Sequence, residues 1–187
     1  LPILRTFGTQ LRQAGSLYLD LGLDADGDGE ITSATAFQLR GSTDTAIAEN
    51  NGSVTIRFTG YEEPTFANAG PISRNCLGAP GSIPAGTTAS IESIFTLNGT
   101  DLRCNDQPIA QNVAAFQVRY LLQGTDQDDP TMLYTNREGV ADWNQVQGVE
   151  VCLVLFGTER IDLPEGASYT GCDGSTAVNI TTLAAPR

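Results

Sequence analysis

Two segments of the chain alternate between apolar and polar side chains, as strands with one buried face do. From Phe116 to Leu122 every second residue is apolar, and polar residues at 117 and 119 fall on the opposite face. Val54, Ile56 and Phe58 alternate with polar residues in the same way, directly after the turn-forming pair at 51 and 52. Both segments are predicted to be half-buried β-strands.

Two further segments extend this predicted sheet. Asn98-Gly99 stands between two β-like runs and indicates a hairpin with a two-residue type I′ turn. The segment from Val149 to Phe156 is apolar on both faces apart from Glu150, which is typical of a central strand covered on two sides. Together the segments predict an antiparallel meander with a strand buried in its middle.

The N-terminal segment has the period of a helix instead. Its apolar residues recur at helical spacing and predict one core-facing stripe: Leu4, Phe7, Leu11, Ala14 and Tyr18. A glycine at position 15 weakens the helix near its end. We therefore expect a helix to be laid against the antiparallel sheet, which is an α+β fold.

Long loops complete the expected organisation. The stretches from Gly60 to Thr88 and from Leu163 to Arg187 are rich in small and turn-forming residues and have no period. The chain has no internal repeat and no linker, so residues 1–187 are predicted to form a single domain. Its length is enough for one ordinary core.

Charge narrows the classes of function. The chain has 22 acidic residues against 10 basic ones, all of them arginine, and neither lysine nor histidine. A net charge of −12 argues against binding to nucleic acid or to an anionic lipid surface. Without histidine, Ser-His-Asp catalysis is excluded and a zinc or haem centre is not expected. The remaining catalytic option is a carboxylate pair such as Glu92 and Glu150 on facing strands, and we expect no enzyme.

Four cysteines allow three disulfide pairings. The neighbour pairing, Cys76–Cys104 and Cys152–Cys172, is favoured because it closes loops of 27 and 19 intervening residues. Each such bridge would stabilise the fold by about 3 kcal/mol, mainly by constraining the unfolded chain. The alternative is four buried thiols in a reducing compartment, and a loop-rich acidic chain fits an oxidising compartment better.

The sharpest chemical motif is an acidic turn that follows the predicted helix. Asp24, Asp26 and Asp28 occupy the first, third and fifth places of a calcium loop, and Glu30 would offer its main-chain carbonyl. The twelfth place, where a bidentate glutamate belongs, is Thr35. The two interpretations are an incomplete Ca²⁺ site that borrows a ligand and a fully solvated acidic turn.

Beyond these patterns, the order of the segments resembles a known family. The runs LRCNDQPIAQNVAAFQVRY (102–120) and VEVCLVL (149–155), with a tryptophan-led turn between them, are similar to the C-terminal half of PilW-type minor pilins of type IV pili. Pseudopilin J of type II secretion has a related layout. LRTFGTQLRQAG (4–15) resembles the end of the pilin helix where it enters the globular head. The resemblance covers almost the whole chain and rests on pattern and order.

This resemblance implies a pilin-like head, with residues 1–18 as the C-terminal part of the pilin helix and residues 19–187 as the loop and sheet head. The apolar half-helix and the cleavage site would precede Leu1, in a chain that has been processed or truncated. Only that half-helix would enter the inner membrane. The head would be periplasmic before assembly and extracellular in the pilus afterwards.

The implied function is structural. A minor pilin joins other minor pilins and the major pilin, with a tip adhesin as a further partner, and primes a fibre used in adhesion and twitching motility. Two alternatives are a type II secretion pseudopilin and a secreted calcium-dependent β-rich adhesion module. A leader and about 20 apolar residues before Leu1 would distinguish the pilin-like proteins from the adhesion module.

Overall fold

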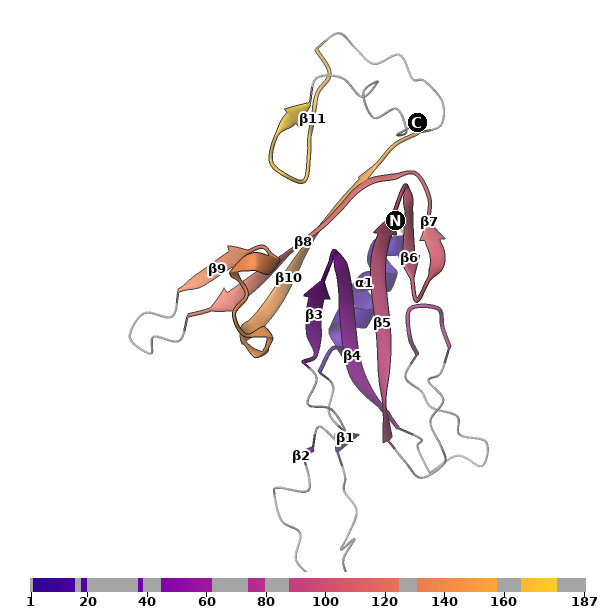
Figure 1. Cartoon of the computed structure of the whole chain (residues 1–187), viewed down its shortest axis with the longest axis vertical. Helices are drawn as coiled ribbons and strands as arrows, with labels where there is room; N and C mark the ends of the chain where they lie inside the picture. Colours follow the sequence, from indigo (N-terminus) through magenta and orange to yellow (C-terminus); the bar gives the residue numbers. More distant parts are fainter. Residues whose placement is uncertain are drawn as a thin grey trace, which may run out of the picture. The chain divides into compact units, whose positions relative to one another are not determined.

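The computed structural model combines one N-terminal helix with antiparallel sheets (Figure 1), an α+β architecture. It describes residues 2–15, 18–19, 37–38, 45–61, 74–79, 88–124, 131–157 and 166–177. The chain divides into two compact units, one of residues 1–50 and 54–94 and the other of residues 51–53 and 95–187. The predicted class of fold is therefore confirmed.

Helix α1 (Pro2–Gln13) belongs to the first unit. Proline is tolerated at the first helical position, because the backbone N–H that it lacks would have no hydrogen-bond partner within the helix there. The buried face consists of Ile3, Phe7 and Gln10, whereas Leu4 is 43% exposed. The predicted stripe was thus wrong at Leu4. The buried face instead includes Ile3, one residue earlier, and the polar side chain of Gln10.

The helix also ends earlier than its apolar spacing suggested. Gly15 has a positive φ of 67°, and its N–H donates to the Arg57 carbonyl at 3.0 Å. This glycine is the usual device for leaving a helix. Tyr18 belongs to a short strand, β1 (Tyr18–Leu19), which pairs with β2 (Phe37–Gln38).

Five strands form the larger sheet, in which each strand is the neighbour of the next one in the chain. They are β3 (Ile47–Asn50), β4 (Ser53–Tyr61), β5 (Thr88–Asn98), β6 (Asp101–Cys104) and β7 (Gln107–Ala110). The predicted alternation in β4 is confirmed, because Val54, Ile56 and Phe58 are at most 3% exposed. Within the first unit, α1 lies behind β4 in Figure 1.

The hairpin between β5 and β6 exists, but its turn differs from the predicted one. Asn98 pairs with Asp101, so the two turn residues are Gly99 and Thr100. Only Gly99 has a positive φ, of 60°. This pattern is that of a type II′ turn with glycine first, since type I′ needs a positive φ at both central residues.

A type I′ pattern occurs at the next hairpin instead. Asn105 and Asp106 link β6 to β7 with φ values of 46° and 63°. Asn51 and Gly52, between β3 and β4, have φ values of 50° and 73°. Asparagine and aspartate tolerate this left-handed region better than other side chains do, which explains their place in the turns.

A three-stranded sheet has the order β10 (Val146–Leu155), β8 (Val113–Gln123) and β9 (Met132–Thr135). The central strand is β8, so the prediction that Val149–Phe156 lies in the middle of a sheet was wrong. An apolar pattern on both faces does not specify how many partners a strand has. The alternation predicted for β8 is right, because Tyr120 is fully buried and the residues at 117 and 119 are exposed.

Aromatic contacts and a disulfide complete the second unit. The short 3-10 helix Trp143–Gln145 places the Trp143 ring edge-on to Tyr120, with 4.8 Å between ring centroids. Cys152 of β10 is bonded to Cys172, which lies between β11 (Tyr169–Thr170) and β12 (Thr176–Ala177). Within the described ranges, no helix is long and apolar enough to cross a membrane.

Candidate functional site

A polar cluster with a buried centre joins α1, β5 and the loop of residues 74–79 in the first unit. We call its members, Gln10, Arg74, Cys76 and Ser93, the polar clasp. The Ser93 hydroxyl, on β5, donates to Gln10 Oε1 on α1 at 2.9 Å and accepts from the Cys76 N–H at 3.0 Å. Gln10 Nε2 donates to the Arg74 carbonyl at 3.2 Å. Gln10 and Ser93 are 3% and 0% exposed, and a buried polar group is tolerated when it is bonded in this way.

The segment 74–79 owes its shape to one asparagine. Asn75 Oδ1 accepts from the N–H groups of Leu77 and Ala79 at 3.0 and 3.1 Å. The Asn75 N–H donates to the Ala79 carbonyl at 3.0 Å and its carbonyl accepts from Gly78 N–H at 2.9 Å. Asparagine commonly organises turns through its own side chain, and here it makes a closed loop beside α1.

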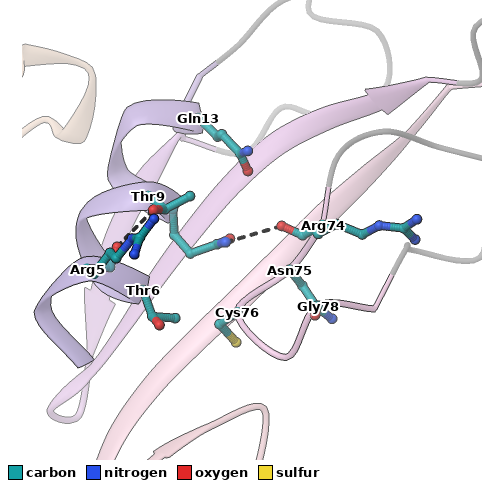
Figure 2. A pocket seen from close by; sticks show the side chains of 9 residues that line it. Arg5, Thr6, Thr9, Gln13, Arg74, Asn75, Cys76 and Gly78 are labelled. Atoms are coloured by element: carbon teal, nitrogen blue, oxygen red, sulfur yellow. Dashed lines mark hydrogen bonds between the residues drawn. The ribbon is translucent and has the colours of Figure 1, made fainter. Parts of the chain in front are cut away.

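A pocket of about 380 Å³ lies between α1 and this loop (Figure 2). Small-molecule sites commonly have volumes of this order. Most of its side chains are polar, and its lining consists of Arg5, Thr6, Thr9, Gln10, Gln13, Arg74, Asn75, Cys76 and Gly78. Because the polar clasp holds Gln10, Arg74 and Cys76 together, the floor of the pocket is fixed by hydrogen bonds.

Two features of the pocket are open to interaction with a ligand. Gln13 Oε1 is buried, and no described residue donates a hydrogen bond to it. Arg5 and Arg74 are exposed, and no described residue forms an ion pair or side-chain hydrogen bond with either guanidinium group. The lining contains no carboxylate. The pocket is therefore lined by two arginines and by one buried acceptor that no described residue pairs.

The predicted calcium ligands, Asp24, Asp26, Asp28 and Glu30, lie outside the described residues. In the part of the chain that the structure describes, no group of three or more acidic or cysteine residues is placed to hold a metal ion. Calcium binding by the Asp24–Glu30 loop thus stays a prediction.

No cysteine of the chain is free. Cys152 is bonded to Cys172 with a Cα–Cα distance of 5.5 Å, as the neighbour pairing predicted. Cys76 and Cys104 are also disulfide-bonded, and in a chain of four cysteines each is left with the other as its partner.

The two glutamates considered for catalysis belong to different sheets, and each is bound by an arginine. Glu92 of β5 accepts from Arg57 Nε at 2.7 Å. Glu150 of β10 lies 3.3 Å from Arg119 Nη1. The structure therefore places the two glutamates in separate sheets, each with an arginine as its ion-pair partner.

A second notable feature is an exposed apolar edge in the second unit. Met132, Leu133 and Tyr134 are consecutive residues of β9 and are 57%, 64% and 46% exposed. Neighbouring side chains of a strand point to opposite faces, so both faces of β9 carry exposed apolar side chains. The Arg119 guanidinium covers the Tyr134 ring, 5.3 Å from its centroid. Exposed apolar groups of this kind commonly mark protein–protein contacts.

Comparison with known proteins identifies no relative: no family model, no curated protein and no solved structure matches the chain.

Sequence reasoning missed the pocket and the polar clasp. One feature of the sequence could have indicated the clasp: Gln10 lies three residues after Phe7, in phase with the buried face of α1. A polar residue in phase with an apolar stripe requires a buried partner. Its partners, Ser93 and the Arg74 carbonyl, are more than 60 residues away, and no local pattern points to them.

Proposed function

We propose that this chain is the head of a PilW-type minor pilin, a structural subunit that joins other minor pilins and the major pilin and helps to start a type IV pilus. The support is the resemblance of segments 4–15, 102–120 and 149–155 to that family, together with a helix laid against an antiparallel sheet. On this proposal α1 is the end of a longer helix whose apolar half anchors the subunit in the inner membrane before assembly.

The observation that carries the assembly role is the exposed apolar strand β9. Met132, Leu133 and Tyr134 of this edge strand are exposed to water, so their burial against another protein would be favourable. Because the chain has a net charge of −12, two copies repel each other at long range. A different subunit is therefore the expected partner, and the isolated chain should be a soluble monomer.

The two disulfides agree with a role as a pilus subunit. A subunit that leaves the cytoplasm meets an oxidising compartment, where such bonds form and persist. The expected location is the inner membrane and periplasm before assembly, and the extracellular fibre afterwards.

The first test is genetic. The complete gene should encode a short basic leader, a cleavage site and about 20 apolar residues immediately before Leu1. A secretory signal peptide without that apolar helix would contradict the pilin proposal. Deletion of the gene in the organism that carries it should reduce the number of surface fibres.

The second test concerns β9. Leu133→Glu should abolish capture of the pilin-like subunits encoded beside this gene and leave the melting temperature unchanged, because Leu133 is 64% exposed. Leu155→Glu is the matched control, since Leu155 is 40% exposed on another strand of the same sheet. Equal capture by the Leu133→Glu variant and the wild type would contradict a role for β9 in assembly.

A further inference from the structure

The charge of the chain is strongly segregated along the sequence. Residues 1–19 and 64–91 contain three arginines, Arg5, Arg12 and Arg74, and no acidic residue. The other residues hold all 22 acidic side chains against seven arginines. The described pocket is lined only by residues from these two acid-free segments. An isolated cationic site in an acidic protein attracts anions that the rest of the surface repels.

Besides its positive charge, the pocket contains groups that can form hydrogen bonds with a ligand. Arg5 belongs to α1 and Arg74 to the opposing loop, so the two arginines come from different sides of the pocket. In Figure 2 the Arg74 side chain extends away from the helix, and its exposure leaves it able to turn toward a ligand. Arginine binds a carboxylate through paired, charge-assisted N–H···O bonds. The hydroxyl groups of Thr6 and Thr9 line the same wall as Arg5.

Gln13 contributes a hydrogen-bond acceptor, whereas the arginines contribute donors. Its buried Oε1 is an acceptor without a donor. Leaving a buried acceptor unpaired is unfavourable, so a ligand that presents an N–H there gains affinity. A simple anion has no such donor. A peptide segment with an acidic side chain presents a carboxylate and a backbone N–H within a few ångströms of each other.

We propose that this pocket binds an acidic peptide segment of another protein, with its carboxylate held by Arg5 and Arg74 and a backbone N–H donated to Gln13 Oε1. This site shares no residue with β9, so it can fail while the assembly proposal holds. The polar clasp holds the helix and the backbone of the loop in place. Binding then requires only that the Arg74 side chain turns toward the ligand and that the Gln13 amide rotates to expose Oε1.

The test measures fluorescence anisotropy of a labelled, end-capped Gly-Asp-Glu-Asp-Gly peptide at low ionic strength, where charge–charge contacts are least screened. Arg5→Gln should raise the dissociation constant roughly tenfold. Arg12→Gln is the matched control, because Arg12 is exposed on the same helix, bonds Thr9 at 3.2 Å and does not line the pocket. Its effect should stay below about twofold.

Two further measurements test the peptide character of the ligand. Gln13→Met keeps the length of the side chain, removes the acceptor and should weaken binding about threefold without lowering the melting temperature. The amide peptide Gly-Asn-Gln-Asn-Gly should not bind measurably.

Several results would overturn the assignment. Equal weakening by Arg5→Gln and Arg12→Gln would mean non-specific attraction to the helix. Displacement of the peptide by equimolar acetate would reduce the pocket to a simple anion site, and tighter binding of glucuronate than of the peptide would indicate an acidic sugar instead. An unchanged affinity in Gln13→Met would remove the role of the peptide N–H.

Discussion

Ser93 donates its hydroxyl hydrogen to Gln10 Oε1 at 2.9 Å, across 83 positions of sequence and with both side chains at most 3% exposed. The same hydroxyl oxygen accepts the N–H of Cys76. One serine therefore links the helix, strand β5 and the loop that forms the wall of the pocket.

Ser93→Ala should lower the free energy of unfolding by about 1–3 kcal/mol, because it removes the donor to a buried amide oxygen and the acceptor of a partly buried N–H. Urea denaturation measures this loss. Ser90→Ala is the matched control, since Ser90 is exposed on the same strand, and its effect should stay within about 0.5 kcal/mol. Equal stabilities of the two variants would show that the clasp contributes nothing.

Removing the Cys152–Cys172 bond should destabilise the second unit. The bond closes a loop of 19 intervening residues, so Cys152→Ala with Cys172→Ala should lower the free energy of unfolding by about 3 kcal/mol. Non-reducing peptide mapping of the wild type should recover Cys152 linked to Cys172 and Cys76 linked to Cys104. A thiol that reacts in the native protein would contradict this connectivity.

The turn between β11 and β12 should depend on pH. Hydrogen bonds from the Ser175 hydroxyl, at 2.6 Å, and from the Ser175 N–H, at 2.9 Å, hold the pKa of Asp173 below its usual 3.8. A lowered pKa means that the carboxylate stabilises the turn above pH 3.8, and that this contribution is lost as pH falls through the folded-state pKa. Carboxyl-carbon NMR should show Asp173 titrating below 3.8, and Ser175→Ala should move its pKa upward. Ser168→Ala, at an exposed serine directly before β11, should leave the titration unchanged.

Calcium should raise the melting temperature if the Asp24–Glu30 loop binds it. At a free concentration of about 100 times the dissociation constant, the gain is roughly 2.7 kcal/mol. Mg²⁺ should substitute poorly, because it demands a tighter octahedron than an open loop supplies. The comparison is thermal melting with Ca²⁺ and with chelator, on the wild type and on Asp26→Ala. An unmoved wild-type midpoint would leave the motif as a solvated turn.

Local patterns predicted the secondary structure where one face of an element is buried. The alternation in β4 and β8 and the period of α1 each reflect a core on one side, and all three elements are present. The type of turn after Asn98 was misassigned, because the pairing of Asn98 with Asp101 makes Gly99 and Thr100 the turn residues. Strand register is set by both strands and cannot be read from the turn sequence alone.

The amino-acid sequence by itself determined the class of fold, the strands of alternating polarity and the net charge of −12, because these depend on local period and composition. Only the tertiary structure decided that β8 is the central strand of its sheet, that Gln10 is buried and that Arg5 and Arg74 line one pocket. The pocket and the surroundings of Gln10 arise where segments more than 60 residues apart meet, and the order of the sheet depends on which strands pair. A local pattern specifies which face of a segment is buried but not what it is buried against.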